Sequence, residues 1–420
     1  MLRELRTRYR RSRAAAGGLL LTFLPLLAPP AGALTTEPHI STGRFEPLFL
    51  LNRVQEYGFG GAWTLHHEDS FYPALGVRAL YATGTETWYP DLFVEQPLVQ
   101  GRVLHLWARY AKEAQWFGFD DHMVTQAENT LAALFLREDF PDYVEVRRIA
   151  GGLRLGPLED QTLTLGIARE RHRALRRTTQ RAGLFGWDRD FSRNPAAVEM
   201  EPNVLTVRYD WRIPGGWTPW SEWSAWDDAS LANHKDGVWL TWEGRWAHPD
   251  LGGELDVSRH LVEARVQATP ARYLEIRARA AVGWTPHGNR NGSAFAVYPQ
   301  DTAQAVAGRL PVQWTFHAGG LGTLRGHDDK EFLGDQLLLA NLEYGLRPEK
   351  NFMVFLFTDL GKAWYQDAEP FAGHGFFARG RLEWDGGIGV ELGDFRAQLG
   401  QNLRELDRDP RLTVRFERPF

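Results

Sequence analysis

The sequence predicts an all-β fold, a transmembrane antiparallel β-barrel, and three observations support this. Segments of about ten residues alternate between apolar and charged side chains, the pattern of strands with one face in lipid and one in a polar lumen. The chain is rich in aromatic residues, with 17 Trp, 12 Tyr and 24 Phe, and such residues gather where a barrel meets the two membrane surfaces. A targeting segment precedes these strands.

Residues 1–33 have the composition of a secretory signal peptide, and we expect residues 34–420 to form an outer-membrane β-barrel. A basic start is followed by a short apolar run, Ala14 to Ala28, and then by Ala31-Gly32-Ala33, which suits cleavage. A retained membrane anchor is the alternative, but three prolines in and beside the run disfavour a spanning helix. Later in the chain, no window approaches the roughly 20 apolar residues of a membrane helix. A closed barrel is the remaining way to span lipid.

The clearest alternation lies between Arg272 and Trp284. One face of this segment carries Leu274, Ile276, Ala278, Ala280, Val282 and Trp284, and the other carries Glu275, Arg277 and Arg279. Segments near residues 165, 208, 242, 265 and 414 repeat the pattern. Three charges on the second face require that this face be wet. A water-exposed antiparallel sheet is the alternative, but the apolar faces often end in Trp or Tyr, as barrel strands do.

The number of strands follows from the length of the chain. Residues 34–420 spread over sixteen strands give about 24 residues for each strand with its loop, a normal allotment for a barrel. About fourteen strands can be recognised by their alternation, and bacterial single-chain barrels have even numbers of strands. We therefore predict sixteen strands, with fourteen as the alternative.

Two stretches depart from the strand pattern. Thr125-Gln126-Ala127-Glu128 matches a helix capping box and precedes apolar residues at helical spacing. A short helix is predicted there, with a strand from Thr130 to Leu136 as the alternative. The second stretch, residues 215–227, carries four tryptophans spaced by three. An interfacial anchor on a loop is the favoured interpretation, and a platform for stacking sugars is the alternative.

Composition and motifs exclude several functions. The net charge of −5 lacks the basic excess of nucleic-acid-binding domains, so no nucleic-acid partner is expected. The absence of Cys removes thiolate nucleophiles and thiolate metal sites. The sequence has no zinc-protease, serine-hydrolase or phosphate-loop motif. The cluster His66-His67-Glu68-Asp69 could bind a metal, but it lies at a strand end, where a solvated turn is the favoured interpretation. We expect no enzyme activity, no metal and no cofactor.

Residues 311–420 resemble the C-terminal barrel of the BamA/TamA superfamily, which includes bacterial surface antigens and two-partner secretion pores. The segments that carry the resemblance are Phe316 to Gly320 followed by Leu324-Arg325-Gly326-His327, then Gly334-Asp335-Gln336, Phe357-Thr358-Asp359-Leu360-Gly361 and Gly387 to Val390. Five strands after the Arg-Gly loop is the count that the superfamily shows. Leu51-Asn52-Arg53-Val54 also resembles an opening strand of barrel-only relatives.

The resemblance has consequences for the two ends of the chain. Relatives usually carry periplasmic POTRA modules, whereas only about twenty residues separate the predicted cleavage site from the first strand here. A barrel-only member is therefore expected. The terminal Phe420 resembles the residue that the insertion machinery recognises at the end of such barrels, although Arg418 interrupts the alternation before it.

By resemblance, the loop with Leu324, Arg325, Gly326 and His327 folds back into the lumen. The parity of the Phe357 strand places Asp359 on the same face as Phe357 and Gly361, so Asp359 is the first expected partner of Arg325 and Glu343 the second. A planar guanidinium binds a carboxylate with two parallel hydrogen bonds, which suits this task. Gly326 would allow a tight turn. An arginine on an ordinary external loop is the alternative.

The function implied by the resemblance is assembly or translocation of outer-membrane or secreted clients in the bacterial outer membrane. The partners expected are outer-membrane lipid and a separate POTRA-bearing or client protein. A passive or selective diffusion pore is the first alternative, because charged lumenal faces tune solute passage. An outer-membrane hydrolase with a site on the barrel wall is the second.

Overall fold

The computed structural model describes residues 41–66, 72–99, 103–117, 124–158, 160–179, 190–213, 237–253, 255–271, 273–287, 310–349, 351–365, 382–393 and 395–416. The predicted signal peptide, the tryptophan-rich stretch of residues 217–226 and Phe420 lie outside these residues. The same holds for His67, Glu68 and Asp69 of the histidine cluster.

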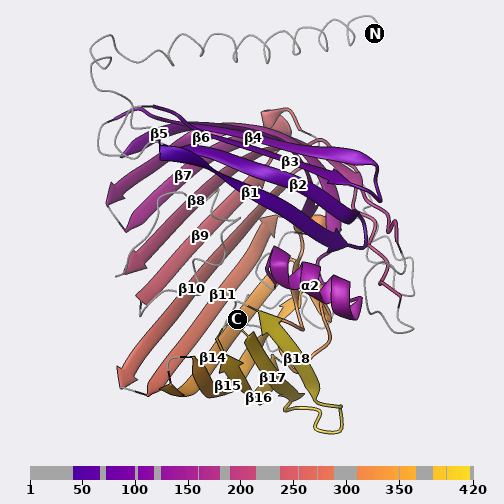
Figure 1. The fold of residues 1–420 in the computed structure, drawn as a ribbon, viewed down its shortest axis with the longest axis vertical. Helices are drawn as coiled ribbons and strands as arrows, with labels where there is room; N and C mark the ends of the chain where they lie inside the picture. The colour runs from indigo at the N-terminus through magenta and orange to yellow at the C-terminus, as the bar shows by residue number, and fades with distance from the viewer. Residues whose placement is uncertain are drawn as a thin grey trace, which may run out of the picture.

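Sixteen strands form one sheet in which each strand pairs with its neighbours in chain order (Figure 1). They are β1 (Ser41–Asn52), β2 (Glu56–His66), β3 (Ala74–Ala82), β4 (Thr87–Pro97), β5 (Leu104–Trp116), β6 (Tyr143–Leu158), β7 (Gln161–Ala174), β8 (Asn203–Ile213), β9 (Gly237–Ala247), β10 (Val257–Ala271), β11 (Leu274–His287), β14 (Gln336–Glu349), β15 (Phe352–Trp364), β16 (Glu383–Leu392), β17 (Phe395–Asn402) and β18 (Arg411–Phe416). The strand pairs of this sheet are antiparallel. The predictions of an all-β fold and of sixteen strands are confirmed.

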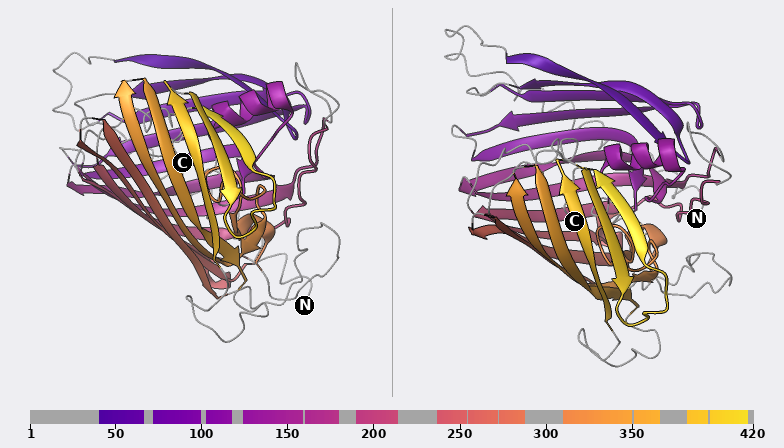
Figure 2. Two further views of the ribbon diagram at one scale, coloured as in Figure 1. Left: turned by 90° about the horizontal axis from the view of Figure 1, so that it is seen from below. Right: turned by 60° about the horizontal axis from the view of Figure 1, so that its bottom comes forward.

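The sheet curls around a lumen, so that its first and last strands approach each other from opposite sides (Figures 1 and 2). Within the described strands, β1 and β18 are the two ends of the strand order, and no ladder joins them. Each of them therefore presents one row of backbone groups that the sheet does not use.

The side chains alternate as the sequence predicts. On β15, Phe355, Phe357 and Asp359 are buried toward the lumen, whereas Leu356 and Leu360 on the opposite face are 59% and 39% exposed. On β11, the three charged residues of the predicted wet face are buried inside the barrel. Apolar side chains thus cover the outside, where they face the hydrocarbon of a membrane, and charged side chains line the lumen.

The remaining elements are short. They are the helix α2 (Gln126–Leu136), the 3₁₀ turns η4 (Pro249–Leu251) and η5 (Val312–Trp314), and the strands β12 (Phe316–Ala318) and β13 (Phe332–Gly334), which pair with each other. A capping box starts α2: the Thr125 hydroxyl accepts from the Glu128 amide, and the Glu128 carboxylate accepts from the Thr125 amide. The helix is therefore confirmed, and the alternative strand there is wrong. Within the described residues, no helix is long and apolar enough to cross a membrane.

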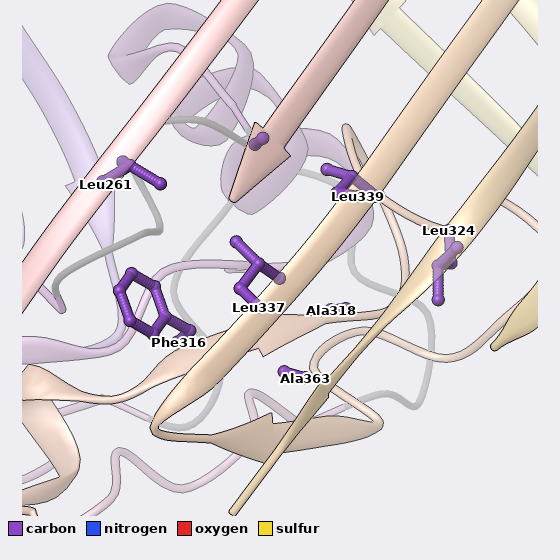
Figure 3. Close-up of a cluster of buried hydrophobic side chains, with 8 residues drawn as sticks. Leu261, Phe316, Ala318, Leu324, Leu337, Leu339 and Ala363 are labelled. Atoms are coloured by element: carbon purple, nitrogen blue, oxygen red, sulfur yellow. The ribbon is translucent and has the colours of Figure 1, made fainter. Parts of the chain in front are cut away.

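An apolar core joins the chain between β11 and β14 to the barrel wall (Figure 3). Phe316 and Leu324 come from this connection, and they pack against Leu261 of β10 and against Leu337 and Leu339 of β14. Burying a side chain of this size contributes about 1.5–3 kcal/mol relative to leaving it exposed. The core therefore holds the connection inside the lumen instead of above it.

Candidate functional site in the barrel lumen

The connection between β12 and β13, residues 319–331, forms a compact loop that we call the lumen loop. Its turn is made by glycines with left-handed backbone angles, with φ of +114° at Gly319 and +80° at Gly320. A side chain at Gly320 would place its Cβ 1.8 Å from Asp329 Oδ1, so only glycine fits. The Gly320 amide donates to the Leu324 carbonyl at 2.9 Å and closes the turn. The Phe316 to Gly320 motif thus starts this turn.

Arg325 sits at the tip of the lumen loop and is buried against β15. Its Nε and Nη2 donate to the two carboxylate oxygens of Asp359 at 2.7 and 2.6 Å. Its backbone amide also donates to Asp359, at 3.1 Å. The guanidinium lies over the ring of Phe357, 3.7 Å from its centre. The arrangement is a bidentate ion pair on an aromatic platform, a geometry that arginine provides and lysine does not.

Glu343 of β14 is a second carboxylate beneath the tip of the loop. It accepts hydrogen bonds from both Arg325 and Arg396 of β17, and Arg277 of β11 lies 3.8 Å away. Arg396 stacks on Phe355, with 3.9 Å between the guanidinium carbon and the ring centre. One carboxylate thus joins the loop to three strands of the wall.

The ionic network continues along β11, β14 and β16. Arg277 pairs with Glu391 at 2.8 Å and with Glu275 at 2.6 Å, and Arg347 binds the same two carboxylates, each at 2.7 Å. Four arginines thus face four carboxylates, so the formal charge of these eight side chains is zero. They are Arg277, Arg325, Arg347 and Arg396 with Glu275, Glu343, Asp359 and Glu391. Burying balanced charges avoids the large cost of an unpaired buried charge.

The sheet register explains why these side chains meet. Arg279, Asn341, Asp359, Asp385 and Asn402 are successive cross-strand partners on β11, β14, β15, β16 and β17. They form one lumenal row that crosses the wall. Cross-strand neighbours on one face have Cβ atoms about 4.5–5.5 Å apart, close enough for polar contacts.

A second row makes room for the loop. It runs from Arg277 through Glu343 and Phe357 to Gly387 and Gly400. A Cβ at Gly387 would lie 2.4 Å from the Phe357 ring, and a Cβ at Gly400 would lie 2.6 Å from the Arg325 carbonyl oxygen. The two glycines give the ring and the loop backbone the space they occupy.

Gly326 and His327 place the rest of the tip against β16 and β17. The Gly326 amide donates to Asp385 at 2.6 Å, and a Cβ there would meet the Asn402 amide nitrogen at 2.6 Å. His327 Nδ1 lies 2.9 Å from the Asp385 carboxylate, and its Nε2 lies 3.1 Å from the side-chain nitrogen Nδ2 of Asn402. The His327 ring also packs edge-on against Phe332.

The charge of Asp385 also affects the protonation of His327. Burial lowers the pKa of His327, but the hydrogen bond and charge of Asp385 outweigh it, so the pKa lies above its ordinary value. The imidazole of His327 is therefore more readily protonated than that of a histidine in water.

The base of the lumen loop is held by exposed ion pairs. Arg408 and Arg411, from the connection before β18 and its first residue, contact Asp328, Asp329 and Glu331 at 2.6–3.5 Å. Lys330 also reaches Asp142, just before β6, at 2.7 Å, and the side chains of this pair are only 8% and 6% exposed. The solvated pairs of Arg408 and Arg411 contribute under about 1 kcal/mol each.

The structure gathers most of the residues that the sequence singled out. Leu324 is fully buried in the apolar core, and Arg325 lies on Asp359 and Glu343, with Phe357 beneath it. Gly361 lies two residues after Asp359 on β15, where a Cβ would meet the Leu338 carbonyl oxygen at 2.4 Å. The expected C-terminal signal, Phe420, lies outside the described residues.

Sequence reasoning missed the contribution of β16 and β17. Asp385, Arg396, Gln398 and Asn402 all contact the loop or its partners. The alternation of β17 shows that Arg396, Gln398 and Asn402 share a face. It does not show which loop residue they meet, because that depends on the register between strands.

Comparison with solved structures identifies the fold. BamA from Haemophilus ducreyi lacking POTRA domains 1–3 matches with a TM-score of 0.54 and 13% identity, over 86% of this chain and 67% of that structure. CdiB from Escherichia coli matches with a TM-score of 0.44 and 12% identity, over 91% and 62%. CdiB from Acinetobacter baumannii matches with a TM-score of 0.40 and 11% identity, over 89% and 65%. The chain thus spans about two thirds of the length of these structures.

No protein-family model matches the sequence, and no curated protein matches it either. The BamA likeness, at 13% identity, shows a shared fold. The chain therefore has the fold of a bacterial outer-membrane β-barrel of the BamA type.

Proposed function

We propose that this chain is an outer-membrane barrel of the BamA/TamA type that assists the assembly or translocation of outer-membrane or secreted clients. The observation that carries the proposal is the Arg325 fork on Asp359, inside a sixteen-stranded sheet that ends at β1 and β18. Residues 1–33 would direct the chain across the inner membrane as a cleaved signal peptide, leaving residues 34–420 as the barrel.

The two ends of the sheet supply the interaction with clients. An edge strand presents amide and carbonyl groups at strand spacing, and an incoming strand can satisfy them by β-augmentation. The lumen loop would act, from inside the barrel, on the region where β1 and β18 approach each other. Through Arg325 and Gly326 it binds residues of β14, β15 and β16, so the wall next to the last two strands keeps one conformation.

The proposed partners are outer-membrane lipid, a client with β-strands, and a separate periplasmic chain with POTRA-like modules. The lipid contact is supported by the exposed apolar side chains on the outer face of the strands, such as Phe49 and Leu356. The periplasmic chain is proposed because the superfamily couples such barrels to client-capturing modules. Native mass measurement of the crosslinked complex, purified gently from outer membranes, would reveal that chain.

The proposal is tested by site-specific photo-crosslinking in cells. A photoreactive residue at Phe49 on β1 lies beside the edge, and one at Leu356 on β15 is a matched control, since both side chains are about half exposed on the outer face. We expect Phe49 to give adducts with other outer-membrane or secreted proteins, identified by mass spectrometry, and Leu356 to give none. Equal protein adducts at both positions, or none at either, would contradict the proposal.

A passive pore is the second candidate, and the charges on the opposite wall favour it. Arg109 lies 2.8 Å from Asp91, and Arg148 lies 2.8 Å from Glu170, so charged groups line the lumen away from the loop. Such charges would tune the passage of ions or small solutes. Steady, salt-dependent conductance in planar bilayers, unchanged by a client, would favour the pore, whereas a silent bilayer would remove it.

A further inference from the structure

Helix α2 lies where a sixteen-stranded barrel would have its seam. All views in Figures 1 and 2 place it between β1 and β18, although it belongs to the connection between β5 and β6. It contacts β1 more extensively than β18, which it meets near its first turn. The element that bridges the two sheet edges in the described chain is thus a helix and not a β-ladder.

The two faces of α2 differ sharply. The inward face carries Glu128 and Asn129, which are buried and polar, together with Ala133. The outward face carries Ala127, Leu131 and Phe135, spaced by four so that they form one stripe. Leu131 and Phe135 are 39% and 40% exposed. The polarity is the same as that of the barrel strands, apolar outside and polar inside.

The outward stripe continues the outer surface of its neighbours. On one side β1 exposes Phe45 and Phe49, and on the other β18 exposes Leu412 and Val414. These strands face the membrane if the barrel spans it, so the apolar stripe of α2 between them faces the same hydrocarbon. A short helix has all its central backbone groups satisfied internally, which lets it stand in lipid where an open sheet edge cannot.

The attachments of α2 to the two edges are unequal. Toward β1, Ala133 packs with Leu51, and the Asn129 amide donates to Asp139 and to the Tyr143 hydroxyl at 2.7 and 3.0 Å. Asp139 in turn accepts from the Arg53 backbone amide at 2.7 Å, directly after β1. The helix is therefore anchored to the first strands by an apolar contact and a buried polar network.

Toward β18, the helix is held by a charge pair. The Arg415 guanidinium donates to both oxygens of the Glu128 carboxylate, each at 3.3 Å, and both side chains are buried. Glu128 is also the capping-box residue of the helix. The helix thus has a broad attachment to one edge and a narrow, charge-dependent attachment to the other.

We propose that α2 seals the seam between β1 and β18, with its apolar stripe against lipid acyl chains, and that the Glu128–Arg415 pair is a latch. When the latch breaks, α2 leaves β18 and remains with β1, and the edge of β18 becomes accessible. The sealing role stands on the fold alone. Its consequence, that an incoming client strand must displace α2 from β18, rests on the proposed function.

The sealing role is tested by spin-label accessibility in proteoliposomes. The chain has no cysteine, so a single Cys can be placed at Leu131 without other changes. Leu356 on β15 is the lipid-facing control, and Leu406, which is 71% exposed in the turn before β18, is the aqueous control. We expect the label at 131 to collide with oxygen more than with a water-soluble nickel complex, as at 356. A preference for nickel, as at 406, would overturn the seal.

The latch is tested with one variant and one matched control. Glu128→Gln keeps a side chain that a capping box accepts but removes its charge, whereas Thr125→Ala weakens the cap and keeps the charge. Spin labels at Ala127 and Leu412 report the distance from α2 to β18, and labels at Leu131 and Phe49 report the distance from α2 to β1. We expect Glu128→Gln to lengthen and broaden the first distance by several ångströms and to leave the second unchanged.

The outcomes separate the seal from the proposed function. Unchanged distances in Glu128→Gln, or equal changes in Thr125→Ala, would overturn the latch. If Glu128→Gln fails to insert, Arg415→Gln breaks the same pair from the other side and takes its place. With a photoreactive residue at Val414 on β18, which is 51% exposed, an open latch should increase client adducts at least twofold. A confirmed seal without any client adducts would leave the seal standing and remove the client role.

Discussion

The two halves of the lumen use similar residues in different settings. Around the lumen loop, Arg325 and Asp359 are almost completely shielded from solvent, with side chains 2% and 0% exposed. On the opposite wall, Arg109 pairs with Asp91 and Glu113 at similar distances, but its side chain is 19% exposed and that of Glu113 is 28% exposed. The difference between these two sites arises because the lumen loop covers Arg325 and Asp359. The comparison shows that burial, more than the number of ion pairs, sets the energetic weight of a lumenal charge.

The largest effect is expected when Arg325 is replaced. Arg325→Ala would leave Asp359 and Glu343 buried with one partner fewer, which costs about 3–5 kcal/mol of stability for a buried pair. Denaturant unfolding of the refolded barrel would measure this, with insertion still expected. Arg325→Lys should lose less stability, because the positive charge remains although the two parallel hydrogen bonds to Asp359 do not.

The double variant provides the control for that prediction. Removing Asp359 together with Arg325 should cost less stability than the sum of the two single losses, since neither side chain is then left buried without its partner. Strictly additive losses would show that the two side chains do not act as a pair.

A smaller effect is expected from glycine replacements that push the loop away from the wall. Gly400→Ala would place a Cβ 2.6 Å from the Arg325 carbonyl oxygen, a backbone atom that cannot move cheaply. Overpacking of this kind costs about 1–3 kcal/mol. In Gly386→Ala, the nearest atom is a Leu403 methyl group at 3.0 Å, which can rotate away, so little loss is expected. Equal losses in the two variants would argue against close contact between the loop and β17.

The opposite wall should respond less to the loss of an arginine. Arg109→Ala removes a partly solvated pair, and we expect a loss of about 0.2–1 kcal/mol because water replaces the lost partner. The same unfolding measurement applies, repeated at high salt, where the difference from the parent should shrink. A loss as large as that of Arg325→Ala would erase the distinction between the two walls.

The smallest effect is expected from the pH dependence of His327. Because its pKa is raised in the folded protein, its contribution is fully present below the ordinary value of 6.5 and is lost as the pH rises through the raised pKa. Stability measured from about pH 6 upward should therefore fall slightly in the parent. His327→Gln cannot titrate, so this part of the decline should be missing from its profile. Identical profiles would show that His327 does not titrate in this range.

Much of the barrel follows from local pattern. Period-two alternation places Arg277, Glu343 and Asp359 on lumenal faces, and the capping box at Thr125 predicts the start of α2. Both signals are local, because side-chain direction along a strand and the first turn of a helix depend on residues within four positions. Sixteen strands follow from chain length and an even-number rule.

The tertiary structure decided which of these residues meet. Asp385 and Asn402 join the loop tip because strand register aligns them with Asp359 across neighbouring strands. Glu128 meets Arg415 although 287 positions separate them, because the sheet curls until its last strand reaches a helix from its first third. The sequence by itself determined which face each residue occupies. Pairing across the lumen and the seam required the curvature and the register of the whole sheet, since one register slip would send every inward charge of a strand into lipid.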